Sequence, residues 1–199
     1  MSNWYWNHDE NEEVEMMKLS IKELVITAFC AALTAALAWV ALPLPLSPVP
    51  VTGQTFGVII AGSILKPRNA ALSQIIYIII GCFGLPVFAG GKSGLGTLLS
   101  PTGGYLWGFV IAACVISLCI EKFGVQNKLF LFGILTLGTI LVIYSAGVFQ
   151  LMLVTKITLA QALTTGVLPF LAGDLFKIIL GTLLISRPTI HKQGNLYRR

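Results

Sequence analysis

Charged residues are scarce in this sequence. Of its 199 residues, 13 are Lys or Arg and 8 are Asp or Glu, a charged share of 11%, whereas soluble domains carry about 25%. The terminal segments 1–23 and 187–199 hold twelve of these charges, so only nine remain in the 163 residues of segment 24–186. This deficit excludes a soluble globular domain, a disordered chain and a secreted disulfide scaffold, and it leaves a membrane protein with several spans.

Side chains that perform catalysis or bind metals are also rare. Both histidines, His8 and His191, lie in the terminal segments, and the four cysteines lie in apolar segments without metal-ligand spacing. Ser93 lies in a GKSG sequence similar to the serine motif of intramembrane rhomboid proteases, but residues 9–190 contain no histidine to act as its base. Aspartyl proteolysis needs two carboxylates, and Asp174 is the only one within a predicted span. The sequence therefore predicts no enzyme, no metal and no other cofactor.

The long uncharged runs predict an all-α membrane protein with six transmembrane helices. A helix needs about 20 apolar residues to cross a hydrocarbon core of about 30 Å. Prolines at positions 43, 45, 48 and 50 divide the uncharged run 24–65 into a first span and a short second one. The predicted spans are 24–42, 51–65, 70–88, 105–120, 129–154 and 168–186, and segment 156–166 is expected to be a polar loop or a surface helix.

The basic residues predict the orientation. If both termini are cytoplasmic, ten basic residues lie in the cytoplasmic segments and only Lys92 and Lys156 lie outside, which satisfies the positive-inside rule. The sequence thus predicts a cytoplasmic tail (1–23), a six-helix transmembrane domain (24–186) and a basic cytoplasmic tail (187–199) in the cytoplasmic (inner) membrane. The net charge of +5 is interpreted as this orientation signal and not as a nucleic-acid site.

Asp174 and Lys177 form the one charged pair inside a predicted span. Their spacing of three places them on one face of a helix, with Cβ atoms about 5–6 Å apart. Charges within a membrane are costly and mark a functional site or an internal ion pair. Two interpretations stay open: a structural pair that neutralises itself, or a ligand site in which Lys177 binds a carboxylate and Asp174 accepts hydrogen bonds from N–H groups.

The first predicted span carries a row of small residues. Ala28, Ala32 and Ala36 recur at every fourth position, and this spacing gives a smooth stripe that another helix can approach closely. Packing within the chain and an interface with another protein are both consistent with the stripe.

Four motifs in the sequence resemble those of a known family. They are residues 49–55 (VPVTGQT), 84–91 (GLPVFAGG), 101–105 (PTGGY) and 169–177 (PFLAGDLFK). Together they resemble BioY, the biotin-specific substrate-binding (S) component of energy-coupling factor (ECF) transporters. The motifs occur in the same order and the resemblance covers nearly the whole of segment 24–186.

The resemblance implies a six-helix S-component bundle that binds biotin from outside the cell for uptake across the membrane. It also implies an energising module, made of a transmembrane T component and two ATPases, which in this family contacts the stripe of Ala28, Ala32 and Ala36. By position, the implied biotin-binding residues are Asp174, Lys177, Gln54, Gly90, Gly91 and Tyr105. An S component for another small anionic vitamin and a ligand-free membrane scaffold are the alternatives. The sequence leaves open whether the protein acts alone, as a homo-oligomer or with the module.

Overall fold

A computed structural model of the chain describes residues 20–42, 49–125 and 127–186. Most of the predicted N-terminal tail, part of the proline-rich connection (43–48) and the predicted C-terminal tail (187–199) lie outside the described residues. Both histidines, His8 and His191, lie outside them as well.

The described residues are mostly helical. Four helices are long and apolar enough to cross a membrane: α2 (Ile21–Ala38), α6 (Gly103–Phe123), the continuous helix Lys128–Thr155 and α10 (Leu168–Ile185). The shorter helical elements are α3 (Gln54–Ile64), α4 (Pro67–Cys82), the 3-10 turn η1 (Ala89–Gly91), α5 (Leu95–Leu99) and α9 (Leu159–Gly166).

Each predicted span coincides with a helix, but the second and third are short. The 11 residues of α3 extend about 16 Å and the 16 residues of α4 about 24 Å, at about 1.5 Å per residue. Neither length reaches across a core of about 30 Å, so six complete crossings stay a prediction. Segment 159–166 is a helix rather than a loop.

A short antiparallel hairpin comes after the first helix. The structure ends α2 at Ala38 rather than at residue 42, because Ala41 and Leu42 form strand β1 (Ala41–Leu42), which pairs with strand β2 (Val51–Thr52). The hairpin leads directly into α3, whose first residue is Gln54. The proline-rich connection is therefore flanked by a paired segment of extended chain.

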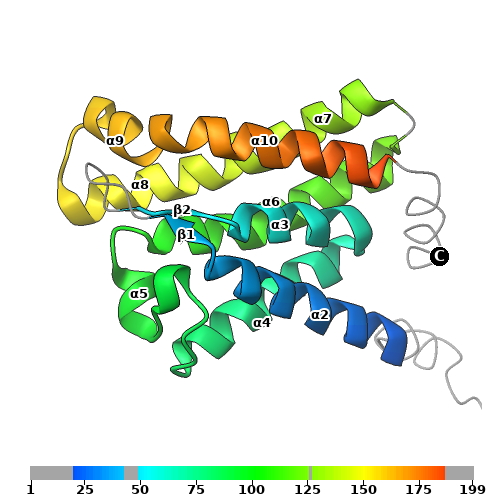
Figure 1. Cartoon of the computed structure of the whole chain (residues 1–199), viewed down its shortest axis with the longest axis horizontal. Coiled ribbons are helices and arrows are strands. Elements are labelled where there is room, and N and C mark those ends of the chain that lie inside the picture. Colours follow the sequence, from blue (N-terminus) through cyan, green and yellow to red (C-terminus); the bar gives the residue numbers. More distant parts are fainter. Residues whose placement is uncertain (1–19, 43–48, 126, 187–199) are drawn as a thin grey trace, which may run out of the picture.

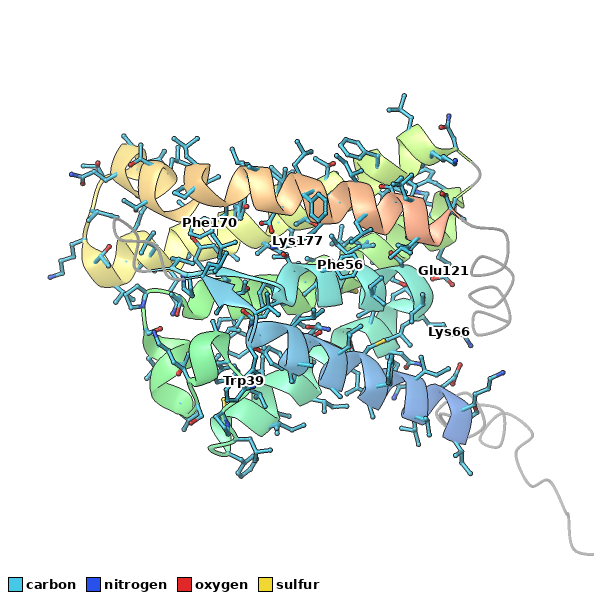
Figure 2. The ribbon with its side chains drawn as sticks, in the orientation of Figure 1. Trp39, Phe56, Lys66, Glu121, Phe170 and Lys177 are labelled. Atoms are coloured by element: carbon cyan, nitrogen blue, oxygen red, sulfur yellow. The ribbon has the colours of Figure 1, made fainter. Side chains whose placement is uncertain are left out.

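Figure 1 shows how the helices are arranged. α6 and α3 lie in the middle of the bundle, with α2 and α4 on one side and α10 on the other. The hairpin, α5 and α9 lie at one end, called here the hairpin end. The first residues of α2 and the last residues of α10 lie at the opposite end, where Figure 2 also places Lys66 and Glu121.

The long helix Lys128–Thr155 changes its winding near its middle. It consists of α7 (Lys128–Thr136), a π-helical segment η2 (Leu137–Ile143) and α8 (Tyr144–Thr155). π-helical turns are rare and are frequently found at functional sites. This one ends directly before Tyr144.

Candidate functional site

Asp174 and Lys177 lie one turn apart on α10 and form an ion pair. Lys177 Nζ lies 2.7 Å from Asp174 Oδ1. Asp174 is 3% exposed, and the side chain of Lys177 is 15% exposed. Figure 2 shows Lys177 in the middle of the bundle, between α10 and α3. The predicted shared face is confirmed, and both charges are held where water has little access.

Hydroxyl groups from two other helices complete the surroundings of the carboxylate. Thr55, on the first turn of α3, donates from Oγ1 to Asp174 Oδ1 at 2.8 Å. Tyr144, at the start of α8, donates from Oη to Asp174 Oδ2 at 2.5 Å. A carboxylate has about four acceptor positions, so these two hydroxyls and Lys177 occupy three of them. One acceptor position on Asp174 remains for a ligand.

The ammonium group of Lys177 is fully occupied by the protein. Besides Asp174, it donates to the Thr52 carbonyl oxygen at 2.5 Å and to Thr55 Oγ1 at 2.9 Å. An ammonium has three N–H donors, so a ligand group that binds Lys177 must replace one of these partners. The buried charges are therefore satisfied before any ligand arrives, as buried polar groups must be for the fold to be stable.

This polar network forms one wall of a small, partly open cavity. The cavity has a volume of about 60 Å³ and is otherwise mainly apolar. Its apolar wall includes Phe88, Leu106, Phe109, Ile143 and Phe170. Ligand sites commonly measure about 300–1,000 Å³, so lining side chains must move apart to admit a ligand of vitamin size. Hydrogen-bonding groups at one wall and aromatic rings around them suit a ligand with a polar head and an apolar body.

Gln54 and Tyr105, both expected from the sequence, also line the cavity. Gln54 Oε1 accepts a hydrogen bond from Thr52 Oγ1 at 2.8 Å, and Gln54 Nε2 donates to the hydroxyl of Tyr77. The Tyr105 hydroxyl donates to the Gly166 carbonyl oxygen at 2.7 Å, across to the end of α9. The structure thus brings together four of the six residues predicted to bind substrate.

Gly90 and Gly91, the other two, lie in the turn beside the cavity rather than in its lining. Both have left-handed backbones, with φ of 68° and 76°, which residues with a Cβ rarely adopt. Their neighbours Ala89 and Lys92 do line the cavity. The two glycines therefore set the path of the backbone beside the cavity and do not contact its interior.

Phe88 anchors this turn to the bundle. Its backbone N–H donates to the Lys92 carbonyl oxygen at 2.9 Å, its ring packs directly on Gly81 of α4, and the ring is edge-on to Tyr77 at a centroid distance of 5.6 Å. Phe88 is 1% exposed. The close approach at Gly81, where a Cβ would clash with the ring, fixes the turn at the hairpin end.

Sequence reasoning missed Thr55 and Tyr144. Both are uncharged, and they lie 119 and 30 positions from Asp174 in the chain. Thr55 is the last residue of the motif 49–55, which was a usable signal. Nothing local marks Tyr144, because aromatic residues are common throughout apolar helices.

The alanines of α2 fall into two rows. Ala28, Ala32 and Ala36 are exposed, whereas Ala31 is buried and Ala35 is half-buried against the rest of the bundle. The row at 28, 32 and 36 is therefore not used for packing within the described chain, and it presents a small-residue surface to the surroundings. Internal packing, one of the two interpretations of this stripe, does not apply to these three residues within the part of the chain that the structure describes.

Comparison with known proteins identifies relatives over nearly the whole chain. The model of the BioY family matches residues 11–193. The "Biotin transporter BioY" of Thermotoga maritima is 35% identical over 167 residues, which cover 84% of this chain and 95% of the relative. The "Probable biotin transporter BioY" of Pyrococcus horikoshii is 36% identical over 177 residues, covering 89% of this chain and 99% of the relative. A crystal structure of the S-component for biotin from an ECF-type ABC transporter superposes with a TM-score of 0.82 at 27% identity, covering 97% of this chain and 100% of that one.

Proposed function

Because the chain belongs to the BioY family, we propose that it is the biotin-specific substrate-binding component of an ECF-type transporter and takes part in biotin uptake across the membrane. The relatives are transporters, and the chain is accordingly a transport protein and not an enzyme. The observation that carries the proposal is the Asp174–Lys177 pair, which lies within a membrane helix, is largely shielded from water and lines the cavity.

The hairpin end faces the outside of the cell, and both tails lie in the cytoplasm. Two findings support this orientation. The start of α2 and the end of α10 lie at the same end of the bundle, and Lys66 and Glu121 lie there too (Figures 1 and 2). The turns expected to be cytoplasmic thus share one end. The chain then crosses the inner membrane six times, with α3 and α4 as short crossing elements completed by the segments around them, and residues 24–186 form the substrate-binding domain.

The geometry of the ion pair limits how biotin can bind. Biotin carries a cyclic urea at one end and a carboxylate at the other, separated by its ring system and a chain of four methylenes. Asp174 and Lys177 touch each other, so one biotin molecule cannot place its carboxylate on Lys177 and its urea on Asp174 while the pair stays closed. The pair therefore binds a single end of biotin.

That end is the urea ring. Its N–H groups suit the remaining acceptor position of Asp174, and its carbonyl oxygen can take one donor of Lys177 in place of the Thr52 carbonyl. The carboxylate then points towards the turn at the hairpin end. Lys92 lies there and is, among the described residues, the one other basic side chain in the cavity lining. The aromatic wall covers the apolar middle of the molecule.

An energising module docks on α2. The exposed row Ala28, Ala32 and Ala36 allows a helix of the T component to approach closely, and the likeness to an S-component of an ECF-type ABC transporter supports such a partner. ATP is then used by the two ATPases of the module and not by this chain.

Two measurements test the proposal. Purified protein is titrated with biotin at equilibrium, and uptake of radiolabelled biotin is followed in cells that express the chain with and without the module. We expect binding in the nanomolar-to-micromolar range and uptake that increases with the module. Absence of biotin binding, or tighter binding of another anionic vitamin, would overturn the substrate assignment; uptake that ignores the module would overturn the partner.

A further inference from the structure

The π-helical segment η2 (Leu137–Ile143) keeps one face of the long helix turned towards the bundle. Through α7 and the first residues of η2, the buried positions follow the α-helical period: 131, 134, 135, 138 and 139. A continuous α-helix would bury positions near 142, 145–146 and 149 next, but residues 145 and 149 are exposed. The buried face continues instead at 143, 144, 147, 148 and 151.

The π-helical segment thus contains one residue more than an α-helix of the same number of turns. Tyr144 is among the first residues whose side chain is turned towards the bundle by this extra residue. Each residue of an α-helix turns the side chain by about 100°, so without the π turn the Tyr144 side chain would be rotated by about 100° from the direction of Asp174. With it, the Tyr144 hydroxyl reaches Asp174 Oδ2 at 2.5 Å, and Ile143 and Tyr144 both line the cavity. Tyr144 is 5% exposed, so its hydroxyl needs a partner within the protein, and Asp174 is the one that it has.

We propose that Tyr144 is the positioning residue that sets the specificity of this site for a neutral cyclic urea over a cation. The inference rests on the proposed binding of biotin and concerns how the site selects its ligand. Thr55 and Lys177 hold Asp174 Oδ1, and Tyr144 holds Oδ2. With both oxygens held, the carboxylate cannot rotate, and its remaining acceptor position keeps a fixed direction.

The same hydrogen bond controls the charge that a ligand meets. Lys177 neutralises Asp174 through Oδ1, and the Tyr144 hydroxyl reduces the negative potential at Oδ2. A neutral N–H donor loses little from this arrangement, whereas a cation would be repelled by Lys177 and would meet only one acceptor position on a carboxylate whose charge is already balanced. If the Tyr144 hydroxyl is removed, Oδ2 is released, and the site gains attraction for a cation while it loses the fixed direction that a urea needs.

The test is Tyr144→Phe, which keeps the ring and removes only the hydroxyl. Purified full-length protein is titrated with biotin and with 2-iminobiotin, in which a cationic guanidinium replaces the urea. Ser117→Ala is the matched control, because Ser117 Oγ also makes a buried hydrogen bond between two helices, to the Leu65 carbonyl oxygen at 2.6 Å, and does not line the cavity.

We expect Tyr144→Phe to weaken biotin binding about ten- to hundredfold, the range for a hydrogen bond to a charged group, and to raise the ratio of 2-iminobiotin affinity to biotin affinity. Ser117→Ala should lower thermal stability and leave both affinities unchanged. Equal weakening of both ligands by Tyr144→Phe, or no weakening of biotin, would overturn the specificity role. Failure of the unmodified protein to bind biotin would instead remove the proposed function, and this inference with it.

Discussion

The cavity wall on α10 and the outer face of α2 differ in polarity and in exposure. On α10, two charges are buried, and each finds partners on neighbouring elements, with Asp174 3% exposed. On α2, the described helix carries no charged side chain after Glu23, and the row Ala28, Ala32 and Ala36 is exposed. The α10 surface makes many hydrogen bonds and faces the interior of the bundle, whereas the α2 surface consists of small apolar side chains and faces outward.

Under the proposed function, a chain with few charges carries two specific surfaces. Recognition of a small ligand within a membrane needs polar groups, and these are stable only where other groups of the protein satisfy them. Recognition of another helix within a membrane needs close approach, which small side chains provide. Substitutions should therefore separate the two surfaces: changes on α10 should affect ligand binding, and changes on α2 should affect only the transport of ligand that is already bound.

The largest effect is expected from Lys177→Ala. The substitution leaves the Asp174 carboxylate buried without its counter-ion, and breaking a buried pair costs about 3–5 kcal/mol. Biotin affinity should fall by more than about a hundredfold in equilibrium titrations of the purified protein. Uptake should be lost whether or not the energising module is present.

The double variant Asp174→Asn, Lys177→Ala separates binding from folding. It removes both charges, so no unpaired carboxylate remains and thermal stability should recover relative to the single variant. Biotin binding should stay lost, because the double variant removes the Lys177 donor for the urea carbonyl oxygen and replaces one acceptor oxygen at position 174 by an NH2 donor. If the double variant bound biotin normally, the pair would be purely structural, and the scaffold alternative would gain support.

The next effect in size is expected from Ala32→Phe, in the middle of the exposed row on α2. The ring should prevent close approach of a partner helix, so module-dependent uptake should fall at least about tenfold, while biotin affinity stays within about twofold. Gly133→Phe is the matched control. Gly133 lies on α7, and no atom lies within 4 Å of the position that a Cβ would occupy there, so the same bulk is added to an open site remote from α2.

Reduced uptake in Gly133→Phe as well would indicate a general sensitivity to bulk on the outer surface. Normal uptake in Ala32→Phe would show that the module does not use this row. Only the combination of impaired uptake in the first variant and normal uptake in the second supports docking on α2.

The sequence predicted the elements of the two surfaces better than it predicted their contacts. Charge scarcity and prolines located the helices, because both reflect the membrane environment directly. The predicted end of the first helix at residue 42 was wrong, because a short apolar strand such as Ala41–Leu42 has no local feature that separates it from the end of an apolar helix. Asp174 and Lys177 were identifiable because intramembrane charges are rare.

The contacts of the other site residues could not be identified from local pattern. The role of Tyr144 depends on the π turn before it, and this turn becomes visible only when the buried face of the whole helix Lys128–Thr155 is known. Thr55 meets Asp174 across 119 positions. The place of Gly90 and Gly91 in a turn beside the cavity, rather than in its lining, results from the tertiary path of the chain.

A smaller effect is expected from Lys92→Gln, which tests whether the biotin carboxylate lies near Lys92, away from the polar wall on α10. Lys92 is exposed, and exposed charge pairs contribute about 0–1 kcal/mol, so biotin affinity should fall about two- to fivefold. The loss should shrink as salt is raised. Biotin amide, which lacks the negative charge, should bind the variant and the unmodified protein equally. Equal loss for biotin and its amide would contradict the proposed position of the carboxylate.

The smallest effect on binding is expected from Tyr105→Phe. Tyr105 lines the cavity, but its hydroxyl makes a hydrogen bond within the protein. That hydroxyl donates to the Gly166 carbonyl oxygen at 2.7 Å, and its removal should cost about 1 kcal/mol of stability while biotin affinity changes less than about threefold. The Tyr105 hydroxyl is thus expected to stabilise the contact between α6 and α9 rather than to bind the ligand, although it lies beside the buried charges. Tyr105→Phe is measured together with Tyr144→Phe, because each variant removes one hydroxyl group from a tyrosine that lines the same cavity. A large loss of affinity in Tyr105→Phe would mean that its hydroxyl exchanges Gly166 for the ligand, and the polar wall would then extend from α10 to α6.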